Sequence, residues 1–255
     1  MSNTLIFIPT YNERENAPRM AREISALQLD ADILFVDDNS PDGTGKLLDQ
    51  LTSELPRLIV HHRQSKLGIG SAHSQAIKWA YSKGYKTLVT LDCDYTHSPS
   101  DIPAMLSIAE NYDMVVGSRW VKAHSLPGWN IYRRAMTISG HLLTKYILGI
   151  KQDASGAFRV YRLTAIPVTV FDLVKSTSYA FFFESLFIIN RNGFKIGEYA
   201  ISLPARTYGN SKMTLSMALR SACYVFELAF SNIRRPKETL LVFNDRLKKI
   251  FWFTH

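Results

Sequence analysis

The sequence predicts an α/β fold in which a mostly parallel sheet carries helices on both of its faces. Short apolar segments rich in β-branched residues alternate with longer segments that have helical apolar spacing. Three of the short segments are followed by acidic residues, as strands often are at the ligand-binding edge of an open α/β sheet. With 255 residues and 46% hydrophobic composition, the chain can bury a large core. We therefore expect a globular protein with a ligand site at one edge of its sheet.

The expected elements alternate regularly through the first half of the chain. Buried strands are expected at residues 5–8, 33–36, 58–60, 87–91 and 114–116. Pro9 ends the first of these strands, Pro99 follows the fourth, and Gly117 ends the fifth. Helices are expected at about residues 12–27, 44–55 and 71–82. The sequence shows no internal repeat and no low-complexity linker.

The segment 87–99 has the clearest chemical pattern, because two carboxylates, Asp92 and Asp94, directly follow an apolar strand. Two carboxylates held close together repel each other, and a hard divalent cation is the usual means of keeping both ionised. Such a cation can neutralise a phosphate. Taken alone, an Asp-x-Asp pair more often caps a helix or lies in a solvated turn.

Acidic residues follow two other expected strands as well. Glu13 comes after the first strand, and Asp37 and Asp38 come after the second. Carboxylates at strand ends can accept hydrogen bonds from a base or a ribose. Any one of them is more often a helix cap, but three sets on the same sheet edge are hard to explain as caps alone.

Other nucleotide or metal signatures are weak or absent. Gly68 and Gly70 open an expected helix, but His73 replaces the third glycine of a dinucleotide fingerprint, and the segment does not follow the first strand. The sequence contains no GxxxxGK[ST] loop, no HExxH and no paired Cys/His site. Cys93 and Cys223 are far apart, so a disulfide framework is not expected.

The net charge of +8 is concentrated at the C-terminal end, which favours an anionic partner. From Arg191 onward there are 11 Lys/Arg against 4 Asp/Glu, a net +7. Residues 213–233 are apolar but contain Arg220 and Glu227, so we expect an amphipathic helix packed on the rest of the protein and not a membrane span. The basic and aromatic residues after it suit an anionic membrane surface, and they are Arg234, Arg235, Lys237, Lys248, Lys249, Phe251, Trp252 and Phe253. No charged leader precedes the apolar run 4–9, so we expect a cytoplasmic protein, associated with the inner face of a membrane.

Seven segments carry a family resemblance, and they occur in order from Leu5 to about Lys212. They are PTYNERENA (9–17), VDDNSPDGTG (36–45), KLGIGSA (66–72), LDCDYTHSP (91–99), VVGSRW (115–120), DASGAFRVYR (153–162) and ARTYGNSK (205–212). The chain resembles family 2 glycosyltransferases, and in particular the polyprenyl (dolichyl) phosphate mannosyltransferase group. The resemblance implies a GT-A fold and transfer of a sugar, commonly mannose from GDP-mannose, to a lipid phosphate with inversion. Residues 1–212 would then form the catalytic domain, and 213–255 a helical, basic and aromatic extension.

The resemblance also implies a donor site. The base and ribose pocket would use Pro9, Tyr11, Glu13, Val36 and Asp38, with Lys66 and Gly70 from the third segment. Asp92, Cys93 and Asp94 match the motif that binds the sugar phosphate and a divalent cation, Mg²⁺ or Mn²⁺. Asp94 would be the direct ligand, and Thr96 stands at the next metal-site position.

Four cations match positions that bind the diphosphate or the acceptor phosphate, namely Arg119, Arg133, Arg206 and Lys212. Positioning and charge neutralisation are the two effects on which phosphate chemistry depends most. For each arginine taken singly, a surface ion pair is the more common role. We expect the loop at Arg206 and Lys212 to close over the bound donor, because its glycine permits a tight bend.

The acceptor decides whether a proton acceptor is needed. A phosphate oxygen is already ionised at neutral pH, whereas a sugar hydroxyl needs a base, for which Glu184 is the best candidate. Phe182 replaces the family's glutamine, and residues 124–126 replace its glycine-rich run. Transfer from a donor such as UDP-glucose to a hydroxyl of a growing polysaccharide is therefore the alternative enzyme function. A nucleotide-binding or nucleic-acid-binding protein without catalysis is the other alternative, but no aromatic RNA-binding motif or recognition helix supports it, so no nucleic-acid partner is expected.

Overall fold

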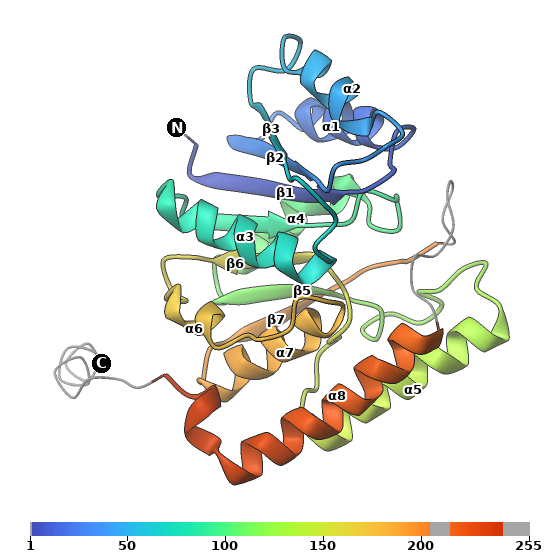
Figure 1. Ribbon diagram of the computed structural model, residues 1–255, viewed down its shortest axis with the longest axis vertical. Coiled ribbons are helices and arrows are strands. Elements are labelled where there is room, and N and C mark those ends of the chain that lie inside the picture. Colours follow the sequence, from blue (N-terminus) through green and yellow to red (C-terminus); the bar gives the residue numbers. More distant parts are fainter. Residues whose placement is uncertain (1, 205–214, 242–255) are drawn as a thin grey trace, which may run out of the picture.

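The computed structural model describes residues 2–204 and 215–241, which form one seven-stranded sheet covered by helices (Figure 1). The strand order is β3-β2-β1-β4-β6-β5-β7. The strands are β1 (Thr4–Thr10), β2 (Ala31–Asp37), β3 (Leu58–His62), β4 (Thr87–Thr90), β5 (Met114–Ser118), β6 (Arg159–Arg162) and β7 (Ile196–Ala200). β6 runs antiparallel to β4 and β5, and the other neighbours are parallel. The mostly parallel sheet predicted from the sequence is confirmed.

Helices cover both faces of this sheet, which is also as predicted. They are α1 (Ala17–Ala26), α2 (Thr44–Leu51), α3 (Ile69–Ser82), α4 (Ile102–Ala109), α5 (Ile131–Leu148), α6 (Thr169–Asp172), α7 (Ala180–Arg191) and α8 (Leu215–Arg234). Side chains of α1, α2 and α4 pack with Ile6 on one face, whereas those of α3 and α7 pack with Phe7 on the other. Neighbouring strand residues point to opposite faces, so each strand supplies both layers of the core.

Some boundaries differ from those expected. The first helix begins at Ala17 and not near residue 12, because Asn12 has a left-handed backbone with φ 56° and residues 13–16 form turns. α2 ends at Leu51, four residues earlier than expected. The strands β6 and β7 were not expected. β6 is only four residues long and begins and ends with arginine, so its apolar signal is weak.

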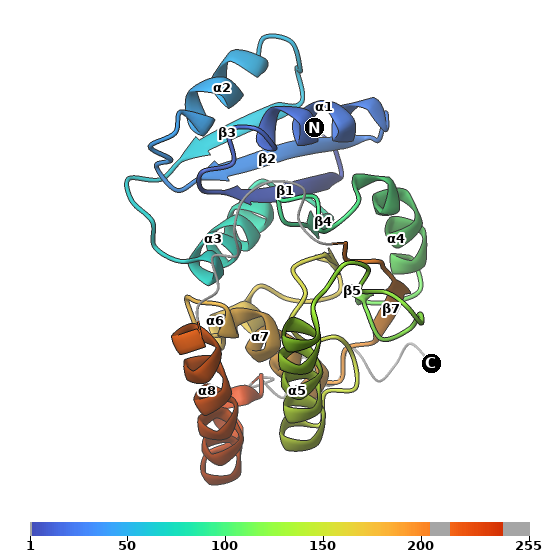
Figure 2. The same cartoon turned by 90° about the vertical axis from the view of Figure 1, so that its right-hand side faces the viewer.

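The helices α5 and α8 lie side by side below the sheet, as both views show (Figures 1 and 2). The amphipathic helix expected within residues 213–233 is α8, which contacts α5 and α7 and buries Val225 and Leu228. None of the helices within residues 2–204 and 215–241 is both long and apolar enough to cross a membrane. The predicted domain boundary at residue 212 lies outside the described residues and stays a prediction.

The parallel register brings the acidic strand ends together. Thr10 at the end of β1 is level with Asp37 at the end of β2, and Phe7 of β1 is level with Thr90 of β4. The segments that follow these three neighbouring strands therefore leave the sheet at one edge, where ligands bind in open α/β folds.

Candidate active site

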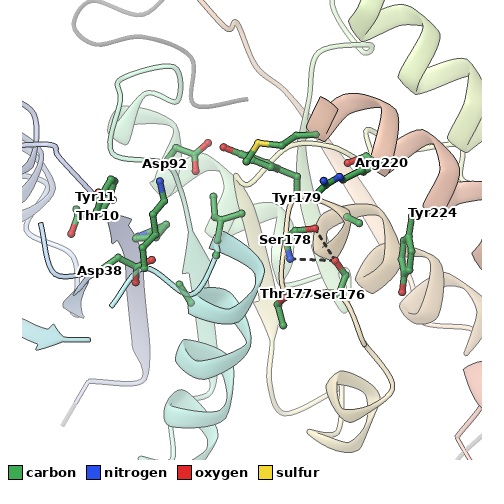
Figure 3. Close-up of a pocket in the computed structure, with 18 of the residues that line it drawn as sticks. Thr10, Tyr11, Asp38, Asp92, Ser176, Thr177, Ser178, Tyr179, Arg220 and Tyr224 are labelled. Atoms are coloured by element: carbon green, nitrogen blue, oxygen red, sulfur yellow. Dashed lines mark hydrogen bonds between the residues drawn. The ribbon is translucent and has the colours of Figure 1, made fainter. Parts of the chain in front are cut away.

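A pocket of about 660 Å³ opens at this edge of the sheet, and its residues form two walls (Figure 3). The strand-end wall comes from the end of β1 and from the segments that follow β1, β2, β3 and β4. It contains Pro9, Thr10, Tyr11, Glu13, Asp38, Lys66, Gly68, Asp92, Cys93 and Asp94, together with Ile69 and Ala72 of α3. The second wall, which we call the helix wall, comes from residues 175–180 and from α8. It contains Lys175, Ser176, Thr177, Ser178, Tyr179, Ala180, Met217, Arg220, Ser221, Tyr224 and Glu227.

Eight of the residues predicted from the sequence lie together in the strand-end wall. They are Pro9, Tyr11, Glu13, Asp38, Lys66, Asp92, Cys93 and Asp94. Within this group, the Nζ atom of Lys66 lies 4.0 Å from the centroid of the Tyr11 ring, which is the geometry of a cation–π contact. Segments far apart in the sequence thus meet in one cavity that combines an aromatic ring, a cation and several carboxylates.

Asp38 is held in place by a buried ion pair that the sequence did not indicate. The Arg63 guanidinium donates to Asp38 Oδ1 at 2.7 Å and to the Ser71 hydroxyl at 2.5 Å. Burial raises the pKa of the Asp38 carboxyl, although the charge and hydrogen bond of Arg63 oppose this shift. Asp37, by contrast, accepts hydrogen bonds from the Ser40 amide and hydroxyl and so stabilises a turn. Of the two neighbouring carboxylates, only Asp38 lines the pocket.

The carboxylates after β4 are fixed by their own loop. Asp94 Oδ1 accepts hydrogen bonds from the Thr96 amide at 3.1 Å and the Thr96 hydroxyl at 2.6 Å. The amide of Asp92 donates to Nδ1 of the buried His97, and this nitrogen also lies 3.9 Å from Asp92 Oδ2. Tyr95 has a left-handed backbone with φ 58°, which turns the chain between these contacts.

A divalent cation at this point would have few protein ligands. Within the described residues, no group of three or more His, Cys, Asp or Glu side chains is placed to hold a metal ion. Asp92 and Asp94 nevertheless both line the pocket, and carboxylate oxygens are hard ligands. This donor set fits a cation that takes its other ligands from a bound substrate and water, as Mg²⁺ commonly does.

The two walls are joined by close packing at the start of α3. The amide of Ser71 donates to the Thr177 carbonyl at 3.1 Å. A Cβ atom at Gly70 would lie 2.7 Å from the Ser178 carbonyl oxygen, and one at Gly68 would lie 2.5 Å from that of Thr177. Gly68 also has a positive φ of 93°, which other residues rarely adopt. These glycines therefore permit the close approach between α3 and residues 175–180.

Glu184, the candidate proton acceptor, lies behind the helix wall and not among the residues that line the pocket. Glu184 is only 1% exposed. Oε1 accepts hydrogen bonds from the Lys175 amide and the Tyr224 hydroxyl, both at 3.0 Å, and Oε2 accepts one from the Ser176 amide at 2.8 Å. Burial raises the pKa of the Tyr224 hydroxyl, which therefore stays a neutral donor. This geometry makes Glu184 the link between residues 175–176 and α8.

Arg119 is also buried away from the pocket lining. Its Nε and Nη2 atoms donate to the two carboxylate oxygens of Asp153 at 2.7 and 2.6 Å, and Nη2 also contacts the Ser155 hydroxyl. Burial would raise the pKa of Asp153, but the Arg119 charge and hydrogen bonds outweigh burial and lower it. Arg119 therefore forms a two-pronged ion pair that ties the end of β5 to the loop before β6.

The other predicted residues lie elsewhere. Val36 is buried in the core, Gly70 packs against residues 177–178, and the Thr96 hydroxyl donates a hydrogen bond to Asp94 without lining the pocket. Arg133 lies in the first turn of α5, with its guanidinium 3.7 Å from the centroid of the Trp129 ring. Arg206 and Lys212, with the loop that they were expected to close, lie outside the described residues.

Sequence reasoning missed the whole helix wall. Met217, Arg220, Tyr224 and Glu227 recur at intervals of three and four residues, so their shared helix face was visible in the sequence. No local pattern indicated that this face would meet the sheet edge. Arg63 could have been suspected as the charged residue directly after β3.

Comparisons with known proteins identify the family. The model of "Glycosyl transferase family 2" matches residues 5–167. An undecaprenyl-phosphate mannosyltransferase from Micrococcus luteus is 34% identical over 211 residues, which are 82% of this chain and 87% of that protein. A polyprenol monophosphomannose synthase from Mycolicibacterium smegmatis is 34% identical over 214 residues, 83% of this chain and 81% of that protein.

Solved structures show the same fold at low sequence identity. TarS from S. aureus, in complex with UDP, has a TM-score of 0.55 and 15% identity, over 91% of this chain and 66% of that chain. Mannosyltransferase PcManGT from Pyrobaculum calidifontis, in complex with GDP-Man and Mn²⁺, has a TM-score of 0.52 and 12% identity, over 90% of this chain and 75% of that chain. The expected GT-A fold is therefore confirmed. With a matching family model over most of its length and relatives at 34% identity, the chain belongs to glycosyl transferase family 2 and is a glycosyltransferase.

Proposed function

We propose that this enzyme transfers mannose from GDP-mannose to a polyprenyl phosphate, with inversion at the anomeric carbon. One observation carries the proposal: Asp92 and Asp94, which follow β4, lie in the same pocket as Tyr11 and Asp38. Carboxylates suited to a cation and diphosphate thus adjoin groups suited to a nucleoside. The choice of sugar and acceptor is supported by the two relatives named for mannosyl transfer involving undecaprenyl phosphate or polyprenol.

The nucleoside would lie against the part of the strand-end wall formed by Pro9, Tyr11, Glu13 and Asp38, beside Lys66. Arg63 holds Oδ1 of Asp38, and Oδ2 receives no hydrogen bond from the described residues. This second oxygen is therefore available to a ribose or base donor. The Tyr11 ring and the Lys66 ammonium supply a flat apolar surface and a positive charge beside it.

Asp94 and Asp92, with Thr96 fixing Asp94, would hold a divalent cation, Mg²⁺ or Mn²⁺, together with the donor diphosphate. When bound, such a cation neutralises the charge that develops on a leaving diphosphate. The mannosyltransferase PcManGT, which shares the fold, was solved with GDP-Man and Mn²⁺. We also propose that Arg133, Arg206 and Lys212 contribute positive charge near the phosphates, as their family positions imply, and that Arg119 acts through its pairing with Asp153.

The acceptor phosphate would attack the anomeric carbon directly. At neutral pH its oxygen is already an anion, so no side chain has to remove a proton. Both oxygens of Glu184 are engaged by hydrogen bonds behind the wall, so it is badly placed as a base. A single displacement, in which the phosphate oxygen enters opposite the departing diphosphate, inverts the configuration. The role of the protein is then to orient two anions and to keep them from repelling each other.

A lipid acceptor implies contact with a membrane, and we propose peripheral association at its cytoplasmic face. Large apolar side chains are exposed on α5 and α8, among them Ile131, Tyr132 and Tyr146 on α5, and Phe230 and Ile233 on α8. Arg234 and Arg235 follow at the end of α8. Apolar and cationic residues on neighbouring helices suit an anionic lipid surface. Sedimentation with anionic vesicles tests this, and recovery of all the enzyme in the supernatant would refute it.

The test of the proposed function is a transfer assay with a panel of sugar nucleotides. Purified enzyme, Mg²⁺ or Mn²⁺ and a short-chain polyprenyl phosphate are combined with each labelled donor, and lipid-extractable product is counted. We expect product from GDP-mannose, with the anomeric configuration opposite to that of the donor. Transfer only to glycan hydroxyls, for example from UDP-glucose, would replace this proposal by the polysaccharide alternative.

A further inference from the structure

The helix wall contains an arginine, Arg220, that was not among the site residues predicted from the sequence. Arg220 of α8 lines the pocket beside Tyr179, facing the wall that carries Tyr11 and Asp92 (Figure 3). Its guanidinium makes no hydrogen bond or ion pair with residues 2–204 or 215–241, unlike the paired Arg63 and Arg119. A guanidinium that faces a cavity without a carboxylate partner is able to bind an anionic ligand.

The position of Arg220 is fixed by the packing of its helix. One turn after Arg220 on the same face, the Tyr224 hydroxyl bonds Glu184, which also holds the amides of Lys175 and Ser176. Val225 on another face of α8 is buried in the core. The helix and residues 175–178 therefore form one rigid wall. The hydrogen bonds that hold this wall together do not involve the Arg220 side chain, which lines the pocket.

Other polar and apolar groups that line the same pocket suit a phosphate with an attached hydrocarbon. The hydroxyls of Ser176 and Ser178 lie 3.3 Å apart in the same wall. Ile69, Ala180 and Met217 add apolar surface to the pocket lining. Glu227, two helical turns beyond Arg220, also lines the pocket, and its negative charge disfavours a phosphate at that end. An anion would therefore settle at the Arg220 end of the helix wall.

We propose that Arg220 binds the phosphate of the acceptor, so that the helix wall is the acceptor subsite opposite the donor subsite. This inference rests on the proposed function. The acceptor phosphate must approach a donor diphosphate past Asp92 and Asp94, and like charges repel one another strongly in a pocket of low dielectric. A fixed positive charge on the opposite wall offsets this repulsion. The planar guanidinium can bind two phosphate oxygens at once, which also orients the attacking oxygen.

The test compares Arg220→Gln, Arg220→Lys and wild type with a short-chain polyprenyl phosphate and GDP-mannose. We expect Arg220→Gln to raise KM for the acceptor by about 10- to 100-fold, because a charge-assisted contact is lost, and to leave KM for the donor within about twofold. Arg220→Lys should recover part of the loss, since it keeps the charge but not the two-pronged geometry. The matched control is Arg57→Gln, an exposed arginine before β3 that is paired with Asp30. Arg57→Gln should have the same KM values for acceptor and donor as wild type.

Two further measurements keep the result interpretable. Thermal unfolding checks that each Arg220 variant keeps the wild-type wall, and a direct titration measures binding of farnesyl phosphate with no donor present. Unchanged acceptor KM and unchanged farnesyl phosphate binding in Arg220→Gln would overturn the Arg220 assignment while leaving the proposed function intact. An equal rise in both KM values would also overturn it, because it would indicate a role in the donor site. If the wild-type enzyme transferred sugar to no lipid phosphate, the proposed function itself would be refuted.

Discussion

The hydroxyl of Tyr224 donates a hydrogen bond of 3.0 Å to Oε1 of Glu184, and this contact joins α8 to α7. The same carboxylate holds the amides of Lys175 and Ser176, so three separate parts of the chain meet at one buried side chain. Glu184 therefore organises the helix wall of the pocket. This placement also explains how a charged residue is accommodated within the apolar sequence of α7.

Substitutions at Glu184 should therefore affect the fold more than the chemistry. Glu184→Gln keeps one acceptor oxygen and should lower kcat by less than about 10-fold, whereas loss of a general base typically costs about 10²- to 10⁴-fold. Glu184→Ala leaves two amides without partners and should lower the free energy of unfolding by about 2 kcal/mol or more. Steady-state kinetics and denaturant unfolding measure the two effects. Tyr224→Phe is the matched control for the helix contact alone, with a loss of about 1 kcal/mol. A 10³-fold fall in kcat for Glu184→Gln with normal stability would restore the role of base.

Asp94→Asn should abolish transfer while preserving the fold. The substitution removes a charged ligand for the proposed cation, but the amide oxygen can still accept the Thr96 hydrogen bonds that shape the loop. Transfer is measured at saturating Mn²⁺, and circular dichroism checks the fold. Excess chelator should likewise abolish the wild-type activity, and added Mn²⁺ should restore it. Full activity of Asp94→Asn, or of wild type in chelator, would refute the metal-dependent mechanism.

Because Arg119 and Asp153 form a buried ion pair, we expect the stability losses caused by substituting each of them to be strongly non-additive. Asp153→Leu leaves the Arg119 charge unpaired in the interior, where Arg119 is only about 7% exposed, and the cost should be about 3–5 kcal/mol of unfolding free energy. The double variant Arg119→Met, Asp153→Leu removes both charges and should lose much less stability than the two single variants combined. Denaturant unfolding of the four proteins forms a double-mutant cycle. Additive losses would show that the ion pair contributes no coupling.

His73 should make the protein less stable in mild acid. Its ring lies among Phe7, Phe181 and Phe182. Burial, together with the charge of Arg159, lowers the His73 pKa from 6.5 to about 3. Below pH 6.5 His73 becomes protonated in the unfolded chain but stays neutral in the folded protein. The free energy of unfolding is therefore unaffected by His73 above pH 6.5 and decreases as the pH drops towards 3. At pH 5 the loss should be about 2 kcal/mol.

His73→Leu should remove this part of the pH dependence. Urea unfolding of wild type and variant at pH 7.5 and pH 5 measures the difference, and each comparison is made within one protein so that altered packing cancels. Identical pH dependence in the two proteins would contradict the prediction.

The sequence predicted the sheet and one wall of the pocket because both depend on local patterns. Apolar β-branched segments mark the strands, and parallel neighbours bring residues such as Asp38 and Asp92 to one edge. The helix wall was not predictable in this way. Its position depends on contacts between residues far apart in the chain, such as Tyr224 with Glu184 and Ser71 with Thr177.

Glu184 was interpreted from the sequence as a candidate base because its contacts, too, come from residues far apart in the chain. In the sequence it is a single acid within an apolar helix, which suggests a reactive group. The donors that engage it lie eight, nine and 40 residues away, and a sequence pattern cannot show that they converge. Lys66, by comparison, was expected at the donor site because residues 66–72 resemble a family segment, and its side chain lines the pocket.

The central claim is that a lipid phosphate, already ionised, attacks the sugar without a protein base. The most direct measurement compares transfer from GDP-mannose to a short-chain polyprenyl phosphate with transfer to the unphosphorylated alcohol, under the same conditions. We predict efficient mannosyl transfer to the phosphate and no measurable transfer to the alcohol. Equal use of the alcohol, or no product from the phosphate with any donor, would contradict the claim.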